Sequence, residues 1–372
     1  MLGFHMGDGL FAVSAAIDAL IVCGVVAWAV RFRPGWRRIA AAAVLALGAL
    51  LLKGIAMVAA GLDRPFGVAH VLWLDLVVVV PLAALLLGLL TWRSGGLLVR
   101  LAVVLGLLLA PVGAYASFVE PNRLVVERAD VPVDAARAGE RPIRVGVLSD
   151  IQFEHVGEHE RNAVRRLMAE RPDVILLPGD YHQGSRASFE RELPRMRALF
   201  ARLRAPGGVF AVQGDQESVA DARRIFAGTG VRLLVNETAR TRVGDRRLTI
   251  GGNEKHDRGR AARGLSDALE RRPGERDVRI LLTHHPDPIL RLAPDTRIDL
   301  VVAGHTHGGQ FQLPLIGPLR TASRVGRTIG AGGLHELDGR RIYVSRGVGV
   351  ERGQAPKLRF RAPPEISILD VG

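Results

Sequence analysis

Cysteine is almost absent from this chain of 372 residues. The single cysteine, Cys23, cannot form an internal disulfide, so a disulfide scaffold is excluded, and its place in an apolar run indicates packing. The sequence also lacks internal repeats and nucleic-acid-binding motifs. Hydrophobic residues make up 48% and charged residues 23%, which excludes a disordered or collagen-like chain.

Acidic residues are outnumbered, with 37 Asp and Glu against 50 Lys and Arg, giving a net charge of +13. A basic balance favours anionic partners such as phosphates or anionic lipid headgroups, and a solvated arginine-rich surface is the alternative. Basicity without a motif does not predict nucleic-acid binding. We expect a membrane and a phosphoester as partners, and no nucleic acid or obligate protein partner.

Long apolar runs occur only in the first third of the chain. Each run has about 20 or more residues, enough to cross a hydrocarbon core of about 30 Å as a helix. The first run has no basic segment before it and is followed by three more, which argues against a signal peptide. The sequence therefore predicts a four-helix transmembrane segment over residues 1–118, with spans at about 9–30, 39–61, 68–92 and 97–118.

Arginines in the short loops predict the orientation of these spans. The first loop and the third loop are both rich in arginine, and basic loops stay in the cytoplasm. Both termini and residues 119–372 are then expected on the extracytoplasmic side, as part of a multi-pass membrane protein. The arginines that carry this prediction are Arg31, Arg33, Arg37, Arg38, Arg93 and Arg100.

Three ionisable residues, Asp18, Lys53 and Asp75, fall inside the predicted spans at a similar depth. Charges in a membrane are costly and usually pair inside a bundle. We therefore predict that Lys53 pairs with Asp18 or Asp75. An ion pair that fixes helix packing and a polar site for a lipid headgroup are the two interpretations.

Beyond the spans, residues 119–142 are polar and proline-rich, typical of a linker, and residues 143–372 alternate between strand and helix patterns. Such alternation predicts an α/β domain. We expect strands at 143–149, 173–178, 208–213, 231–235, 246–251, 278–283, 299–303, 341–345 and 365–370, and helices at 158–170, 187–204, 217–227, 259–271 and 286–292.

Polar clusters follow five of these strands. Ligand sites in α/β sheets lie beyond the carboxyl ends of strands. Oxygen and imidazole donors without cysteine suit Mn, Fe, Zn or Mg, and glycines beside them allow the backbone to come close. The clusters begin at Asp150, Gly179, Gly214, His284 and Gly304.

These clusters resemble the motifs of the calcineurin-like metallophosphoesterases, in particular the membrane-associated YkuE/YaeI-like subgroup. The most specific motif is GHTHGGQ at 304–310. LSDIQ at 148–152, LPGDY at 177–181 and LLTHHPD at 281–287 support it in the right order. The resemblance covers about residues 143–370 and implies a four-layer αββα sandwich with two divalent metal ions at its strand ends.

The resemblance also implies roles for individual residues. Asp150 and His307 would bind the first metal, and Asp180 would bridge both metals. The second metal would be held by Asp215, which stands where the family has Asn, together with His284 and His305. Gln152 stands where the family has a His ligand of the first metal, and Gln216 where it has the His that assists the leaving group. The catalytic residues would be Asp180, Asp215, His305 and Gln216.

The departures from the family pattern shift the expected chemistry. Gln152 would offer an amide oxygen in place of an imidazole nitrogen, and Asp215 adds a negative charge and a hard oxygen. Both changes favour Mn or Mg over Zn, with Mn expected first. Gln216 cannot act as an acid, which favours good leaving groups such as pyrophosphates. His155, His182 and His285 lie beside the motifs as substitutes for that acid, with supporting or surface roles as the alternative.

The implied function is a membrane-anchored metallophosphoesterase that hydrolyses phosphodiester or pyrophosphate bonds of envelope or lipid-linked substrates. A water activated by two metals would attack the phosphoryl group. Arg346 would stabilise its oxygens, unless it is a structural arginine paired with a carboxylate. The alternative function is a non-catalytic membrane sensor whose degenerate metal site holds a phosphorylated ligand.

Overall fold

The computed structural model of the chain describes residues 6–31, 36–59, 61, 66–93, 96–254, 260–271, 274 and 276–372. The chain divides into two compact units. The first, which we call the helical unit, comprises Met1–Val119 and Arg352–Lys357. The second, the α/β unit, comprises Glu120–Glu351 and Leu358–Gly372.

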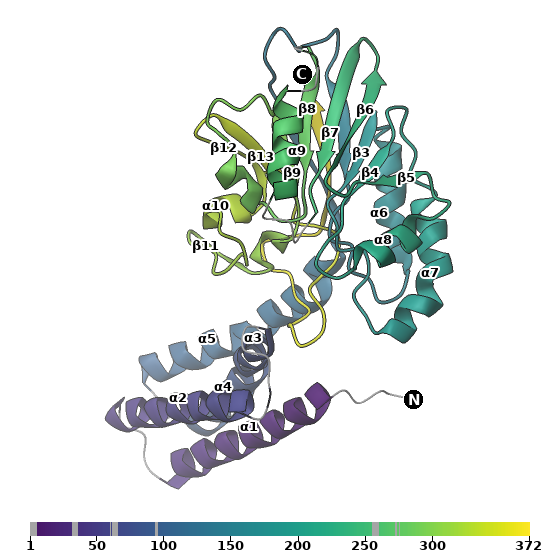
Figure 1. Cartoon of the computed structure of the whole chain (residues 1–372). Coiled ribbons are helices and arrows are strands. Elements are labelled where there is room, and N and C mark those ends of the chain that lie inside the picture. Colours follow the sequence, from purple (N-terminus) through teal and green to yellow (C-terminus); the bar gives the residue numbers. More distant parts are fainter. Residues whose placement is uncertain are drawn as a thin grey trace. The chain divides into compact units, whose positions relative to one another are not determined.

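The helical unit consists of long apolar helices that follow the four predicted runs (Figure 1). Two short π-helical segments, Asp75–Val79 and Tyr115–Val119, interrupt the last two runs. The α-helices of this unit are α1 (Met6–Arg31), α2 (Trp36–Ala59), α3 (Phe66–Leu74), α4 (Val80–Thr91) and α5 (Leu97–Ala114).

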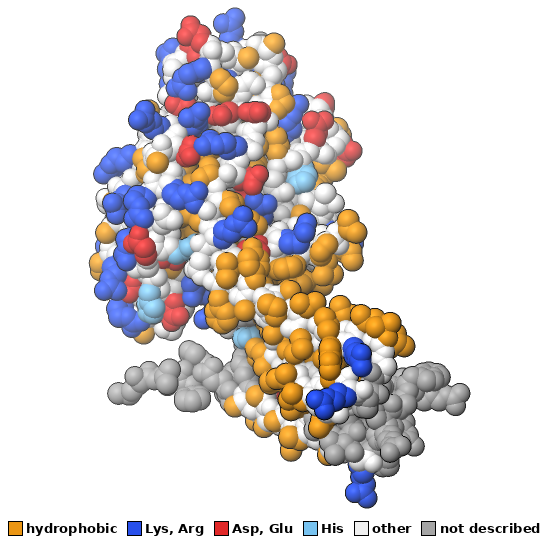
Figure 2. Space-filling model, turned by 180° about the vertical axis from the view of Figure 1, so that it is seen from behind, with side chains coloured by type: hydrophobic (Ala, Val, Ile, Leu, Met, Phe, Trp, Pro, Cys, Tyr) orange, Lys and Arg blue, Asp and Glu red, His pale blue; other side chains and the backbone are white. Residues whose placement is uncertain are grey.

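Among the described residues, two continuous helical stretches are long and apolar enough to cross a membrane, Phe66–Thr91 and Leu97–Asn122. Shorter apolar helical stretches lie within α1 and α2. Apolar side chains cover much of the visible face of this unit (Figure 2). Four spans and their orientation stay predictions; Arg33 and the side chains of Arg37 and Arg38 lie outside the described part of the chain.

The predicted pairing of Lys53 is confirmed. Its Nζ lies 2.5 Å from Oδ1 of Asp18 and also contacts the carboxylate of Asp75. The side chain of Lys53 is fully buried, and both aspartates are nearly so. We call these three residues the ion triad; it joins α1, α2 and the π-helical segment.

Two six-stranded mixed sheets form the centre of the α/β unit. In the first, the order is β1 (Val125–Val131), β14 (Glu365–Val371), β2 (Ile143–Val147), β3 (Val174–Leu177), β4 (Val209–Ala211) and β5 (Val231–Leu233). In the second, the order is β12 (Gly333–Leu337), β13 (Arg340–Val344), β9 (Leu300–Ala303), β8 (Val278–Leu282), β7 (Arg246–Gly252) and β6 (Glu237–Val243). Strands β2 to β5 are parallel, as are β7, β8, β9 and β13.

The sheets pack face to face, with helices on their outer sides. Strand β3 shows why: its side chains alternate, so Val174 and Leu176 enter the core between the sheets, and Ile175 and Leu177 enter the core under the helices. Both faces are buried, which explains the uninterrupted apolar run. Figure 1 shows α6, α7 and α8 beside β3–β5 and α9 beside β8 and β9. The layers are therefore helices, sheet, sheet, helices, as expected.

Two helices of this unit begin at a serine that caps their first turn. Ser185 accepts a hydrogen bond from the Ser188 amide at the start of α7, and Ser218 does the same for the Asp221 amide at α8. The helices are α6 (Glu158–Ala169), α7 (Arg186–Phe200), α8 (Val219–Phe226), α9 (Arg260–Arg271) and the short α10 (Arg327–Gly330).

All nine expected strands and five expected helices are present, the last helix as the 3-10 turn Asp287–Arg291. Residues 125–131 of the expected linker instead form β1, which pairs in parallel with β14. Strands β6, β12 and the hairpin of β10 (Gln312–Leu313) and β11 (Gly317–Pro318) were not expected. Polar residues interrupt their patterns, because β1, β6 and β12 are edge strands with exposed or half-buried side chains.

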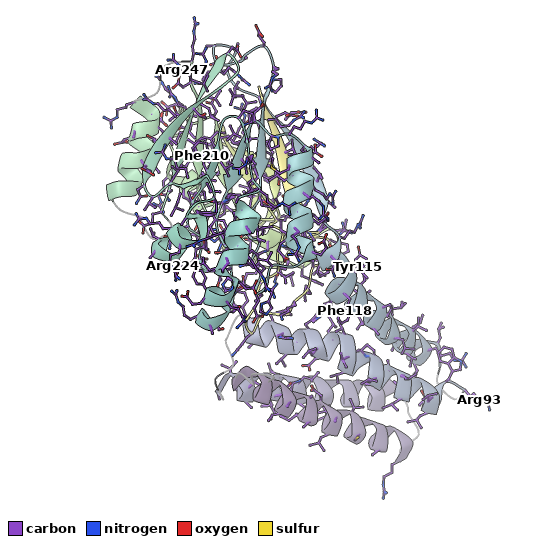
Figure 3. The ribbon with its side chains drawn as sticks, turned by 90° about the vertical axis from the view of Figure 1, so that its right-hand side faces the viewer. Arg93, Tyr115, Phe118, Phe210, Arg224 and Arg247 are labelled. Atoms are coloured by element: carbon purple, nitrogen blue, oxygen red, sulfur yellow. The ribbon has the colours of Figure 1, made fainter. Side chains whose placement is uncertain are left out.

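Basic side chains are spread over the visible face of the α/β unit and do not form one patch (Figure 2). Many of them pair with acids. Arg224 contacts Glu190 at 2.6 Å, and Arg247 lies 3.2 Å from Asp277. Both arginines lie at the surface, in contrast to Phe210, which lies among the strands (Figure 3). This arrangement favours a solvated surface over an extended anion-binding face.

Candidate metal centre

Seven predicted site residues follow directly on five central strands. Asp150 and Gln152 follow β2, Asp180 follows β3 and Asp215 follows β4, while the histidines follow β8 and β9. Because the carboxyl ends of these parallel strands meet at one edge, the side chains come together. We call Asp150, Gln152, Asp180, Asp215, His284, His305 and His307 the strand-end cluster.

The backbone of this cluster is unusual. Asp150, Gln152, Asp180, His305 and His307 all have positive φ angles, between 42° and 70°. Side chains other than glycine rarely adopt this region, and such residues gather at active sites, where the surrounding structure holds them in place. The turn after each strand therefore aims its side chain at one shared space.

Two groups of donor atoms lie within this cluster. Asp150, Asp180 and His284 form one buried group, and Asp215, His284, His285 and His305 form the other; in each, the ligand atoms lie within 4.8 Å of one another. His284 belongs to both groups. The second group contains Asp215, His284 and His305, the residues expected at the second metal, together with His285, which was expected only as a neighbour of the motif. The first group contains the expected Asp150 and Asp180, but His284 stands in it in place of the expected Gln152 and His307.

Asp215 is the acceptor at the centre of the second group. Its Oδ2 lies 3.0 Å from Nδ1 of His305, and its Oδ1 lies 3.0 Å from Nε2 of His285. Burial would raise the pKa of Asp215, yet the neighbouring imidazoles of His284, His285 and His305 hold that pKa well below its usual value. A carboxylate at this position therefore stays ionised, as a metal ligand must.

The first group carries more negative charge than its own side chains neutralise. Burial raises the pKa of Asp150 to about 6, and the charge of Asp180 acts in the same direction. Burial opposes protonation of His284, but the carboxylates of Asp180, Asp215 and Asp150 raise its pKa to about 10. The pKa values of both neighbouring groups are thus raised, which indicates a place for added positive charge.

Two buried ring nitrogens test whether divalent ions fit here. Nε2 of His284 and Nε2 of His307 make no hydrogen bond among the described residues. Nε2 of His284 lies 3.5 Å from Oδ1 of Asp180, and Nε2 of His307 lies 3.9 Å from Oδ1 of Asp150. Ligands about 2.1 Å from one ion are about 3–4 Å apart. The donors therefore fit divalent ions better than hydrogen bonds.

The second ring nitrogen of each of three histidines has a fixed partner, as is usual for metal ligands. Nδ1 of His284 lies 2.9 Å from the Pro178 carbonyl, and Nε2 of His305 lies 3.1 Å from the Ala322 carbonyl. Burial, together with the Arg359 guanidinium 3.1 Å from Nδ1, holds the pKa of His307 well below its usual value. A neutral imidazole is the form that binds metal.

A family model described as calcineurin-like phosphoesterase matches residues 143–309, the stretch that holds every residue of the strand-end cluster. The chain carries a calcineurin-like phosphoesterase domain. Proteins similar to this chain are named as metallophosphoesterases, a phosphodiesterase and a pyrophosphatase. Phosphoester hydrolysis is the activity class of the domain.

Three bacterial relatives illustrate the similarity. The chain is 26% identical over 287 residues to an uncharacterized metallophosphoesterase, YkuE of Bacillus subtilis, covering 73% of this chain and 93% of the relative. It is 25% identical over 244 residues to the phosphodiesterase YaeI of Escherichia coli, covering 62% and 82%. It is 25% identical over 327 residues to the UDP-2,3-diacylglucosamine pyrophosphatase LpxG of Chlamydia trachomatis, covering 71% and 94%.

Glycines allow the strand-end turns of the phosphoesterase domain to approach one another. A Cβ on Gly214 would lie 2.1 Å from the amide nitrogen of Asp180. A Cβ on Gly304 would lie 2.2 Å from Oδ2 of Asp150. Any side chain at either position would displace an aspartate of the cluster.

Glu217 is a buried residue that the sequence did not single out. Its carboxylate accepts hydrogen bonds from the backbone amides of Asp180, Tyr181 and Gly214, at 2.6–3.1 Å. Burial, and then the charge of Asp180, raise the pKa of Glu217 to about 8. Glu217 therefore holds the turns after β3 and β4 together. In the sequence, only its position at the end of the polar cluster 214–217 could have pointed to it.

The structure separates the three histidines that lie beside the motifs. His285 lies within the cluster and stacks on His305, with ring centroids 3.7 Å apart. His182 is buried edge-on against Phe153 and Phe189, and His155 is exposed beside Glu192. Only His285, of these three, belongs to the site.

Arg346 and Gln216 were both expected to assist the reaction, and the structure gives each of them other contacts. Arg346 pairs with Glu127 and Glu365, each at 2.6 Å, which is the structural interpretation given above. The Gln216 side chain is exposed, while its backbone amide donates to Oδ1 of Asp180 at 2.9 Å. Gln216 therefore positions Asp180 through its backbone.

Proposed function

We propose that this protein is a membrane-anchored, metal-dependent phosphoesterase that cleaves phosphodiester or pyrophosphate bonds of lipid-linked or envelope substrates. The observation that carries the proposal is the pair of adjacent donor groups sharing His284. Two divalent ions held there would polarise the phosphoryl group and lower the pKa of the attacking water. Mn²⁺ is the expected ion, because the proposed ligands combine three carboxylates with three imidazoles and include no thiolate.

The residues of this chain have distinct parts in that reaction. Asp150 and His307 would hold the first ion, and Asp215, His284 and His305 the second. Asp180 belongs to the first group and lies 3.5 Å from Nε2 of His284, the residue shared by both groups, so it would bridge both ions. With Gln216 unable to donate a proton, a substrate whose leaving group departs as an anion suits the site best, and a pyrophosphate meets that condition.

An exposed apolar hairpin beside the site supports a lipid-linked substrate. The loop that joins β10 to β11 exposes Leu315 fully, and Ile316 and Leu319 are 57% and 59% exposed. The segment after β11 reaches the cluster, since the Ala322 carbonyl contacts His305. Exposed apolar side chains of this size mark contact with a lipid or a partner. The pyrophosphatase LpxG is named for a diacylated substrate.

The helical unit supports membrane anchoring, and the arginine-rich loops support an extracytoplasmic phosphoesterase domain. An anchored enzyme of this kind would work on substrates already in the bilayer. The apolar loop would then contact acyl chains while the phosphoryl group reaches the strand-end cluster.

The test uses the full chain in detergent with Mn²⁺ and bis-p-nitrophenyl phosphate. We expect hydrolysis that requires both Mn²⁺ and Asp180, with Asp180→Asn at the level of the blank and the exposed-acid control Asp295→Asn unchanged. The double variant Leu315→Ser/Leu319→Ser should still hydrolyse bis-p-nitrophenyl phosphate. It should no longer hydrolyse a lipid-linked pyrophosphate. A folded chain that binds Mn²⁺ without hydrolysing either substrate would favour the sensor.

A further inference from the structure

We propose that Glu351 is a ligand of the first metal ion, in place of the imidazole that Gln152 does not provide. The proposal rests on the proposed two-metal function and adds a ligand to it. Glu351 lies in the segment after β13, outside every motif that the sequence analysis used. Its place in the fold brings it to the same space as Asp150, Asp180 and His307.

The position of the Glu351 carboxylate carries the proposal. Its Oε2 lies 4.0 Å from Nε2 of His307, and the same nitrogen lies 3.9 Å from Oδ1 of Asp150. The buried ring nitrogen of His307 therefore faces two carboxylates at nearly equal distances. An ion between these groups would have Asp150 on one side and Glu351 on the other.

Gln152 links Glu351 to the bridging aspartate. Its side-chain nitrogen donates to Oδ2 of Asp180 at 2.9 Å and to Oε2 of Glu351 at 3.2 Å. One amide group thus presents its hydrogens to two carboxylates, much as a cation would. This orientation makes Gln152 a positioning residue for Asp180 and Glu351, where the resemblance had implied a ligand.

Neutral groups hold Glu351 in this position. Its Oε1 accepts a hydrogen bond from the Gln183 side chain at 2.5 Å, and its backbone amide donates to the Gln310 side chain at 2.7 Å. Only 16% of the Glu351 side chain is exposed, and no lysine or arginine of the described chain lies within 4.0 Å of the carboxylate. A cation from solution would stabilise a largely buried carboxylate that has no fixed cation.

The exchange of His for Gln and the addition of Glu351 have one chemical consequence. The first site loses an imidazole nitrogen and gains a hard, charged oxygen. Carboxylate-rich sites suit Mn²⁺ and Mg²⁺ better than Zn²⁺. The first ion is therefore expected to be Mn²⁺ or Mg²⁺ even where Zn²⁺ is available.

The test measures Mn²⁺ binding to the full chain in detergent by the electron paramagnetic resonance signal of free Mn²⁺. We expect two ions per wild-type chain. Glu351→Gln should weaken one of the two sites by about 100-fold, and the exposed control Glu336→Gln should leave both unchanged. In the Glu351→Gln background, Gln152→His should restore the weakened site, because it returns an imidazole to the same space.

The outcomes separate this proposal from the proposed function. Two tight ions in Glu351→Gln would overturn the role of Glu351 and leave the two-metal function standing. Failure of Gln152→His to restore the site would overturn the claim that Glu351 takes the place of the missing imidazole. A wild-type chain that binds no Mn²⁺ would overturn both proposals.

Discussion

The two buried charged clusters of this chain differ in where their positive charge comes from. In the ion triad of the helical unit, Lys53 lies between Asp18 and Asp75 and contacts both. In the strand-end cluster of the α/β unit, carboxylates face imidazoles, and no lysine or arginine of the described residues pairs with Asp150, Asp180 or Asp215.

That difference distinguishes a structural cluster from a functional one. A cation that belongs to the chain cannot be exchanged, so the triad fixes how helices pack. Imidazoles are neutral when they bind metal, so the strand-end cluster keeps a charge excess that an exchangeable ion can balance. Removing the fixed charge of Lys53 should therefore destabilise the ion triad. Removing exchangeable ions should destabilise the strand-end cluster.

The largest effect is expected from Lys53→Met. This change leaves two buried aspartates without their cation, and breaking a buried ion pair costs about 3–5 kcal/mol. All four tryptophans lie before residue 93, so tryptophan fluorescence reports unfolding of the helical unit alone. We expect that transition to move to milder conditions, while Mn²⁺ binding by the α/β unit is unchanged.

Two further variants sharpen the result for the triad. The exposed control Lys357→Met should leave the fluorescence transition in place. Replacing all three charged groups, as Asp18→Asn/Lys53→Met/Asp75→Asn, should recover most of the lost stability, because no buried charge remains unpaired. Full stability of the single variant Lys53→Met would contradict a packing role.

A smaller effect is expected from chelation of metal. An ion that binds only the folded state at 100 times its Kd stabilises that state by about 2.7 kcal/mol. Excess chelator should lower the melting temperature of the α/β unit, followed by circular dichroism, and leave the tryptophan transition of the helical unit unmoved. A shift of the tryptophan transition on adding chelator would contradict the claim that only the strand-end cluster depends on an exchangeable ion.

The smallest effect is the dependence of metal affinity on pH. Protons compete with metal because the pKa of Asp150 is about 6 and that of His284 about 10 without metal. Each proton displaced makes binding about tenfold tighter per pH unit. Between pH 5 and 6, metal binding displaces protons from both groups. Between pH 7 and 9, it displaces a proton from His284 alone.

Mn²⁺ titrations at several pH values check this expectation. Affinity should rise about 50-fold from pH 5 to 6 and about tenfold per unit above pH 7, and Asp150→Asn should remove the steeper part. Equal affinity across this range would mean that neither group binds the ion. The ion triad, with no exchangeable ligand, offers no such pH dependence of metal binding.

Local patterns in the sequence predicted much of the fold. Apolar runs bounded by glycine and proline located nine strands, eight of them inside the two sheets, because strands buried on both faces need apolar side chains throughout. The edge strands β1, β6 and β12 lack this signal, so the sequence predicts a linker at β1 and no strand at β6 or β12; β5 is the one edge strand that the sequence predicts. Motifs also located Asp150, Asp180 and the histidines, because the turn after each strand is a local feature.

By itself, the sequence determined the kinds of chemistry available: donors without cysteine, a lysine among apolar runs, and turns that end strands with aspartate or histidine. The tertiary structure decided which groups meet. Glu217 and Glu351 join the site, and Arg346 is committed to Glu127 and Glu365. The pairing of β3 with β4 brings Glu217 to Asp180, and the packing of the two sheets brings Glu351 and Arg346 to their partners.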